Sequence, residues 1–198
     1  MNIAFLASYN GSSAKAITEA CFDGELRASP TLMISNNPNS KALEWALAKG
    51  LKTLCLNSKN YPDPDELDCA IAQKLKDEKI KLIVCSGYMK LIGPETIAAF
   101  PNAILNVHPA LLPKHGGQGM YGRHIHEAVK AAHEAQTGIT IHLVNGEYDK
   151  GHVVAQKTIP LMPQDSVDDI ENKVKTAEPS FYIETIKKIL SGEIILPA

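Results

Sequence analysis

The sequence predicts an α/β, Rossmann-like fold with a mostly parallel sheet and helices on both of its faces. Short apolar segments alternate with helical patterns through the first half of the chain, as in NIAFLA at 2–7 and KLIVC at 81–85. These runs are apolar at consecutive positions, which is typical of parallel strands buried on both faces. In the second half, TGITIHLV and HVVAQKTI are separated by only a short link, which favours an antiparallel C-terminal strand pair.

Each expected element has its own local signal. The expected strands are apolar or β-branched runs bounded by turn residues, and they lie at 2–7, 31–35, 51–56, 81–85, 103–108, 137–144 and 152–159. The expected helices repeat apolar positions at helical spacing, at 13–22, 40–48, from Asp63 or Asp65 to about Glu78, at 94–99, at 122–133, and from a capping box at Ser166–Asp169 to about Leu190. We find no internal repeat and no linker, so we expect a single domain over residues 1–198.

Bulk composition narrows the class of protein. The chain has 198 residues, of which 44% are hydrophobic and 21% charged, as is ordinary for one globular domain. A formal net charge of −2 provides no basic field for nucleic acid, and no apolar run reaches membrane-spanning length. The start, MNIAFLASYN, lacks the basic and apolar regions of a signal peptide. We therefore expect a cytoplasmic protein that binds neither nucleic acid nor a membrane.

The cysteines and histidines predict neither a disulfide framework nor a metal site. The four cysteines form no C-x-x-C pair and lie among apolar neighbours, so we expect buried free thiols at Cys21, Cys55, Cys69 and Cys85. His124 and His126 are two residues apart in a helical pattern, so they do not share a face. No strong zinc spacing is present, and metal-dependent hydrolysis is disfavoured.

The segment NVHPALLPKHGG, at 106–117, is the strongest functional signal. Strand alternation puts Asn106 and His108 on one face, at the carboxyl end of a strand. Pro109 and Pro113 then hold the turn rigid. Ligands of open α/β sheets bind at this edge, and buried polar groups need partners. We therefore favour a functional role over the alternative of a capping histidine beside a structural asparagine.

Two loops that follow other strands are weaker candidates. In LASYNGSS, at 6–13, Gly11 and the first N–H groups of a helix can hold an anion, although an ordinary turn has the same pattern. In SGYMKLIG, at 86–93, Met89, Leu91 and Ile92 could line a pocket for a flat ring, but from these residues alone we favour a loop that packs its apolar side chains into the core.

The link NGEYDKG, at 145–151, carries an acidic candidate. Asp149 beside His108 would favour the imidazolium form and hold the ring in place. Alone, an acid before Lys-Gly is more often part of a turn. His142, on the preceding strand, is either a supporting residue of the site or a satisfied core histidine.

The motif N-x-H-P-x-L-L-P, followed after a helix by TGITIHLVNGEYDKG, resembles the folate-dependent formyltransferases. The resemblance runs from NIAFLASYNGSS through SGYMKLI to VKTAEP at 174–179. Within that family it is closest to the phosphoribosylglycinamide formyltransferases of purine biosynthesis. It implies a Rossmann-like sheet, 10-formyltetrahydrofolate as co-substrate, a small phosphorylated amine as acceptor, and no metal.

The resemblance also implies roles for individual residues. The catalytic residues fall on Asn106, His108 and Asp149. The acceptor and its phosphate fall on a loop and on the last helix, at Gly11, Ser12, Ser13, Lys175 and Glu178. The folate falls on Asn106 and on two loops, at Met89, Lys90, Leu91, Ile92, Asn145, Gly146, Glu147, Tyr148 and Asp149. Residues 1–100 would then form the acceptor-binding half, and residues 101–198 the catalytic and folate-binding half.

Departures from the family pattern leave the acceptor open. The phosphate loop of the family commonly reads G-N-G-S-N or G-T-G-S-N, whereas this chain has Tyr9-Asn10-Gly11-Ser12-Ser13. Residues 61–67 also lack an arginine that many members have there. Formyl transfer to another small amine, such as an amino sugar, and hydrolysis of formyltetrahydrofolate are the alternatives. The sequence does not distinguish a monomer from a homodimer.

Overall fold

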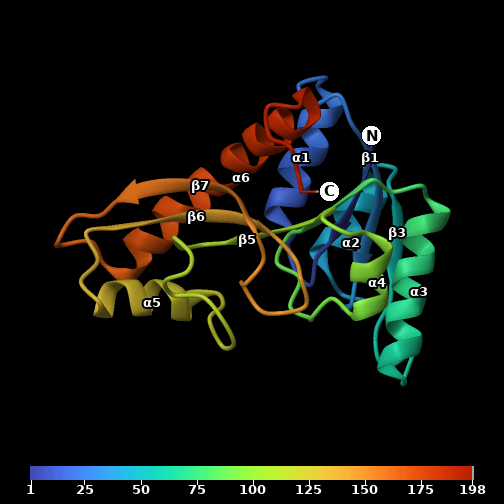
Figure 1. Cartoon of the computed structure of the whole chain (residues 1–198), viewed down its shortest axis with the longest axis horizontal. Helices are drawn as coiled ribbons and strands as arrows, with labels where there is room; N and C mark the ends of the chain where they lie inside the picture. Colours follow the sequence, from blue (N-terminus) through green and yellow to red (C-terminus); the bar gives the residue numbers. More distant parts are fainter. Residues whose placement is uncertain (198) are drawn as a thin grey trace.

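A computed structural model, which describes residues 1–197, contains one sheet with the strand order β3-β2-β1-β4-β5-β6-β7 (Figure 1). The strands are β1 (Asn2–Leu6), β2 (Ser29–Ser35), β3 (Lys52–Cys55), β4 (Leu82–Cys85), β5 (Ile104–His108), β6 (Gln136–Leu143) and β7 (Val153–Pro160). The first five strands pair in parallel, and β6 is antiparallel to both β5 and β7. The predicted fold class and the antiparallel C-terminal pair are therefore confirmed.

The helices begin and end close to the expected positions. They are α1 (Ser12–Phe22), α2 (Lys41–Ala48), α3 (Pro64–Asp77), α4 (Pro94–Ala99), α5 (Arg123–Ala131) and α6 (Val167–Ser191). Asp63 caps α3 by accepting a hydrogen bond from the N–H of Asp65, with proline at the first helical position. The capping box at the start of α6 is confirmed, because Ser166 and Asp169 each accept the other's backbone N–H.

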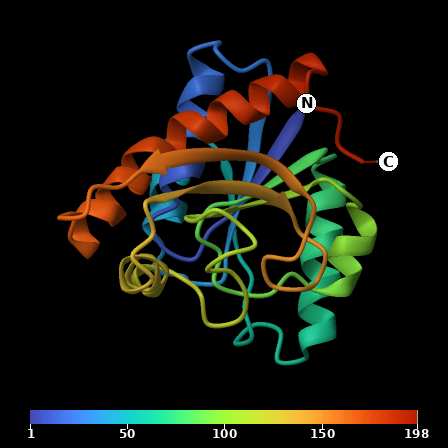
Figure 2. The same ribbon diagram turned by 60° about the vertical axis from the view of Figure 1, so that its left-hand side comes forward.

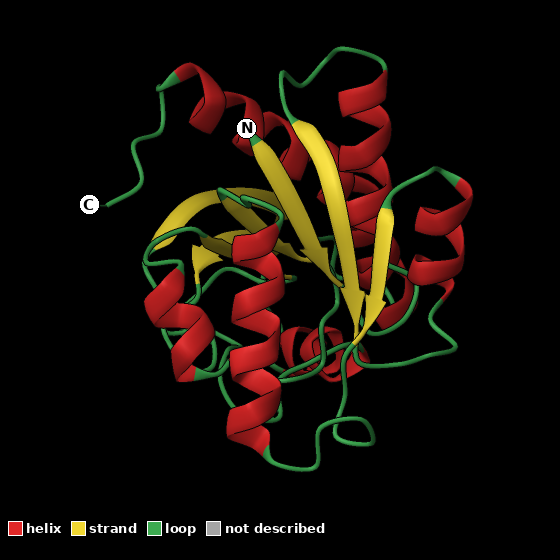
Figure 3. Ribbon diagram, turned by 90° about the vertical axis from the view of Figure 1, so that its right-hand side faces the viewer, coloured by secondary structure: helices red, strands yellow, loops and turns green. Residues whose placement is uncertain are grey.

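The sheet separates two hydrophobic cores. Alternate residues of β1 face opposite sides, so that Ile3 and Phe5 pack with α1, α2 and α6, whereas Ala4 and Leu6 pack with α3 and α4. All four side chains are fully buried. Figure 2 shows α1 and α6 on one side of the sheet and α3 and α4 on the other, and Figure 3 shows helices on both sides of the strands. Burial on both faces explains why the parallel strands are continuously apolar.

Loops that follow β1 and β4 are joined at the carboxyl edge of the sheet. The N–H of Met89 donates to Ser8 Oγ at 2.8 Å, and the N–H of Ser8 donates to the Gly87 carbonyl at 3.1 Å. The N–H of Ala14, in the first turn of α1, donates to Ser86 Oγ at 3.1 Å. Because β5 lies next to β4 and parallel to it, the loop after His108 emerges at the same edge.

The cysteines are free thiols, as expected, but they are not all buried. Cys85 is buried, and burial raises its pKa to about 12. Cys21 and Cys55 are half-buried, and Cys69 is exposed. Cys69 is exposed because α3 buries the face that carries Asp68 and Ala72, and the next position along a helix points about 100° away. The expectation of a buried thiol is therefore wrong for Cys69.

No helix within residues 1–197 is both long and apolar enough to cross a membrane.

A buried carboxylate joins α3 to the start of α4. Asp68 accepts hydrogen bonds from the N–H of Glu95 at 2.7 Å, the N–H of Thr96 at 3.2 Å and the Thr96 hydroxyl at 2.5 Å. A Cβ on Gly93 would lie 2.2 Å from Asp68 Cγ, so only glycine leaves room for this contact. Asp68 thereby holds α4, which directly follows the candidate loop at 86–93.

We predict that Asp68→Ala lowers the free energy of unfolding by roughly 2–3 kcal/mol, because it leaves buried N–H groups of α4 without an acceptor. Urea denaturation followed by circular dichroism measures this loss. Asp65→Ala, at an exposed carboxylate in the first turn of α3, is the matched control and should cost only a few tenths. Equal losses in the two variants would contradict the capping role of Asp68.

Candidate active site

Four polar side chains meet beside the end of β5. Asn106 lies directly opposite His142 in the β5–β6 pair, and their Nδ2 and Nε2 atoms are 3.1 Å apart. Asp149, from the β6–β7 loop, places Oδ1 3.5 Å from His142 Nε2 and Oδ2 3.4 Å from His108 Nδ1. Both histidines are buried, at 3% and 2% exposure. The structure therefore brings together all three residues to which the resemblance assigns catalysis, and His142 as well.

The contacts of His142 define how the Asn106 amide points. His142 Nδ1 lies 2.9 Å from the Leu143 carbonyl, which can only accept, so Nδ1 carries a proton. In the neutral ring Nε2 is then an acceptor, and it receives a hydrogen bond from the Asn106 NH₂ group. An amide NH₂ has two donors, so one N–H of Asn106 is left for another partner.

Asp149 reaches this cluster by a reversal of the chain. Leu143, at the end of β6, pairs with Leu105 near the start of β5, so the loop leaves at the wrong end for a contact with His108. Asp149 adopts φ +57°, a left-handed conformation that aspartate tolerates better than most residues. A Cβ on Gly151 would lie 1.6 Å from the Leu143 carbonyl oxygen, so the return path requires glycine there. The D-x-G pattern thus has a steric cause.

Asp149 is an anion held among donors. Burial by itself raises the pKa of this carboxyl, but a hydrogen bond from His108, the charge of His108 and the N–H of Gly117 lower it. The Gly117 N–H donates to Oδ2 at 2.9 Å. The net result is a pKa well below the usual range for aspartate.

A short segment that follows the motif also touches the cluster, and the sequence assigned it no role. We call residues 114–117 the strap. The carbonyl of His115 lies 2.8 Å from His108 Nε2, so both ring nitrogens of His108 face acceptors. The His115 side chain places Nε2 3.2 Å from Glu134 Oε1, and Lys114 Nζ lies 3.0 Å from the same oxygen. The glycine pair after His115 was the only sequence signal for such a turn.

The expected acceptor residues are only partly assembled. The Ser13 hydroxyl donates to Glu178 Oε1 at 2.5 Å, which joins the start of α1 to α6. Burial raises the pKa of Glu178, and the Ser13 hydrogen bond and the charge of Lys175 only partly offset this effect. Gly11 has φ +63°, and a Cβ there would lie 2.9 Å from that of Ala42. Ser12 is exposed in the first turn of α1.

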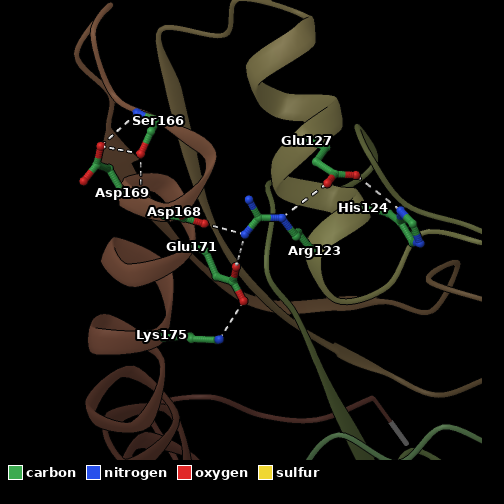
Figure 4. Close-up of polar contacts among 8 residues, drawn as sticks. All are labelled: Arg123, His124, Glu127, Ser166, Asp168, Asp169, Glu171 and Lys175. Atoms are coloured by element: carbon green, nitrogen blue, oxygen red, sulfur yellow. Dashed lines mark hydrogen bonds and ion pairs between the residues drawn. The ribbon is translucent and has the colours of Figure 1, made fainter.

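Lys175 has a different partner in this structure. Its Nζ pairs with Glu171 Oε1 at 2.6 Å, and its side chain is 67% exposed. Glu171 also pairs with Arg123 at the start of α5, which contacts Asp168 and Glu127 (Figure 4). Lys175 therefore belongs to a charged surface network between α5 and α6, and no contact joins it to Gly11–Ser13.

The expected folate residues lie on two loops beside α4. Gly146 would place a Cβ 3.6 Å from Ile97 of α4, and Met89–Ile92 run directly into the same helix. Met89 and Leu91 are 44% and 51% exposed, so their apolar surface is open to a flat ring. Ile92 is only 6% exposed and packs in the core beneath α4, as expected if this part of the loop serves core packing.

The side chains of the other expected folate residues are exposed. Lys90, Asn145, Glu147 and Tyr148 are exposed at the rim of the two loops. The Asn145 side chain accepts the N–H of Glu147 at 3.2 Å and so supports the turn before Asp149. An exposed aromatic and apolar rim beside a buried polar cluster fits a ligand with one flat, amphipathic end.

Within residues 1–197, no three His, Cys, Asp or Glu side chains are grouped as a metal site would require. His124 lies 3.4 Å from Glu127, and His126 is buried, so these two histidines of α5 point to different surroundings.

Comparisons with known proteins identify the family of this chain. The sequence profile of the formyl transferase family matches residues 1–186. A phosphoribosylglycinamide formyltransferase of Haemophilus influenzae is 34% identical over 98% of this chain and 89% of its own length. The chloroplastic enzyme of the same name from Arabidopsis thaliana is 33% identical over 97% of this chain, which spans 66% of that protein.

A solved structure shares the architecture described above. The glycinamide ribonucleotide transformylase 1 of Symbiobacterium toebii superposes with a TM-score of 0.91 at 28% identity, over 100% of this chain and 91% of the other. The match of the family profile to nearly the whole chain is decisive, and the chain therefore belongs to the formyl transferase family.

Proposed function

We propose that this protein transfers a formyl group from 10-formyltetrahydrofolate to the amine of phosphoribosylglycinamide, in purine biosynthesis. The observation that carries the proposal is the buried cluster of Asn106, His108, His142 and Asp149 at the open edge of the sheet. Relatives that carry this activity in their names cover almost the whole chain. The cytoplasmic location expected from the sequence belongs to the same proposal.

The co-substrate, when bound, supplies the formyl carbon that the acceptor amine attacks. The new C–N bond to the amine replaces the C–N bond to the folate nitrogen, and that nitrogen leaves with the proton that the amine loses. In this proposal Met89, Leu91 and the 145–149 loop hold its flat ring system, because their apolar surface is open beside α4. Gly11, Ser12 and Ser13 hold the acceptor's phosphate at the start of α1, where backbone N–H groups favour anions. Glu178 lies close enough to contact the same acceptor, because it binds Ser13.

The chain's own residues handle charge and protons. Negative charge develops on a carbonyl oxygen during acyl transfer, and preorganised donors that face that oxygen are the largest single catalytic effect in such sites. We assign this role to the free N–H of Asn106 and to the positive charge of His108, whose two ring nitrogens face Asp149 and the strap. Asp149 stays ionised, as its lowered pKa requires, and helps to move the proton of the attacking amine. His142 orients both Asn106 and Asp149.

We propose that residues 1–198 form one domain with two functional halves. Residues 1–100 supply the acceptor loop, and residues 101–198 supply catalysis and most of the folate contacts. The last helix crosses this division, because Glu178 sits with the acceptor loop.

The test of the function is a spectrophotometric assay with a 10-formylfolate donor, with and without phosphoribosylglycinamide. We expect release of deformylated folate only when the acceptor is present. Release in water alone would favour the hydrolase instead. Acceptance of an amino sugar but not of phosphoribosylglycinamide would point to the altered loop, where Tyr9 is 65% exposed.

We predict that His108→Ala lowers kcat by roughly 10²–10³-fold, because it removes a positive charge beside the oxygen on which negative charge develops. Folding should be nearly normal, since His108 is the last residue of β5, at the carboxyl end of the strand. Steady-state kinetics and circular dichroism measure the two effects. His152→Ala, at an exposed histidine, is the control. Loss of the folded signal in His108→Ala would show a structural role instead.

We predict that Asp149→Asn lowers kcat by about 10²-fold and changes the affinity for the folate donor far less. The amide keeps the shape of the side chain but removes the negative charge beside both histidines. Turnover measurements and calorimetry separate the two quantities. An unchanged kcat would remove Asp149 from the mechanism.

The acid dependence of stability tests the contacts of Asp149 without an activity measurement. The folded pKa of Asp149 lies below the unfolded value of about 3.9, so its ionised form stabilises the fold above that pH. This contribution is lost as pH falls through the folded pKa. The difference in unfolding free energy between wild type and Asp149→Asn should therefore be present at about pH 6 and shrink below about pH 4. A difference that grows on acidification would contradict the contacts.

A further inference from the structure

The strap contacts both His108 and Asp149. The carbonyl of His115 faces His108 Nε2 at 2.8 Å, and the N–H of Gly117, two residues on, donates to Asp149 Oδ2 at 2.9 Å. Between them, Gly116 packs so closely that a Cβ would lie 2.4 Å from Leu112 Cδ2 and 3.3 Å from Asp149 Cβ. A shift of the strap would therefore alter the surroundings of both candidate catalytic groups at once.

The backbone of the strap does not hold this position by itself. His115 adopts φ +55°, a conformation that is uncommon for residues other than glycine, although histidine tolerates it better than most. Two glycines follow, and one of them, Gly117, has φ +102°. Such a segment needs an external anchor, and the anchor has to act on His115 or its neighbours.

Glu134 provides that anchor from the turn before β6. One of its carboxylate oxygens lies 3.2 Å from His115 Nε2 and 3.0 Å from Lys114 Nζ, and the other lies 3.2 Å from the lysine. The Glu134 and His115 side chains are only 21% and 16% exposed, whereas Lys114 is 69% exposed. The hydrogen bonds from Lys114 and His115 lower the pKa of Glu134, so it remains a carboxylate. The shielded partner, His115, is the more effective one, because exposed pairs contribute little.

We propose that Glu134, through His115, is a positioning residue for His108 and Asp149. It contacts neither residue, and it acts by fixing the carbonyl that faces one and the N–H that binds the other. Displacement of a catalytic group by about 1 Å can cost about 10²-fold in rate without loss of binding. The kinetic part of this inference rests on the proposed formyl transfer, and its structural part does not.

The test compares Glu134→Ala with Glu78→Ala. Glu78 is a matched control, because it pairs with a lysine, Lys52, and is 22% exposed, but lies at the end of α3, away from the strap. We expect Glu134→Ala to lower kcat by about 10–100-fold and to change the KM values by less than about threefold. Glu134→Gln keeps an oxygen acceptor and should lose less. Glu78→Ala should retain the wild-type kcat.

A second variant identifies the route. Asparagine tolerates a positive φ, so His115→Asn removes the imidazole contact with little added strain. We expect it to lower kcat as Glu134→Ala does, and the double variant to be no worse than either single variant, as in one shared pathway. Additive losses in the double variant would overturn the proposed route through His115.

A spectroscopic measurement keeps the test independent of activity. The ¹⁵N signals of the His108 ring, assigned with His108→Ala, should shift in Glu134→Ala and stay in place in Glu78→Ala. If wild type proved inactive with every acceptor, the proposed function would fail and this measurement would still decide the positioning role. Unchanged His108 signals, an unchanged kcat in an active enzyme, or a kcat that rises would each overturn the proposal.

Discussion

The arrangement of the polar cluster at the carboxyl end of β5 depends on the ionised carboxylate of Asp149. A half-buried charge is unfavourable unless polar groups surround it, and the three groups that contact this one come from different parts of the chain. His108 belongs to β5, His142 to β6 and the Gly117 N–H to the strap. The requirement to satisfy one carboxylate therefore brings three segments together, and the orientation of each histidine follows from it.

The reversal of strand direction after β5 determines how these groups reach Asp149. An antiparallel β6 puts His142 directly opposite Asn106, which pairs the two side chains without any loop. The same direction makes the β6–β7 loop start beside the other end of β5. The chain must then turn back, which explains the left-handed Asp149 and the absence of room for a side chain at Gly151. The site is thus built by a defined departure from the parallel pattern of the first five strands.

The sequence predicted what periodicity and caps control, and it missed what long-range contacts decide. A period of two placed Asn106 and His108 on one face, and the caps at Asp63 and Ser166 defined the starts of two helices. The strap has no period, and its anchor, Glu134, is remote in sequence, so nothing local indicated their contact. Lys175, which the resemblance assigns to the acceptor, pairs in this structure with Glu171, one helical turn away, and its role stays a prediction. Cys69 was expected inside because its neighbours are apolar, although the face of α3 decides its exposure.

In the loop at 9–13, the tyrosine at position 9 replaces a glycine that is common in the family, and the backbone there is still held in place. The carbonyl of Tyr9 accepts hydrogen bonds from the N–H of Ala42 at 2.9 Å and from Ser40 Oγ at 2.8 Å, at the start of α2. These bonds use only the backbone of residue 9, so they hold the path into Gly11 whatever side chain stands there. The Tyr9 ring remains largely exposed. A substitution at this position can therefore alter which acceptor fits, while the donors on β5 and β6 remain as they are. In the proposed function, acceptor choice and transfer chemistry therefore belong to separate elements of one sheet.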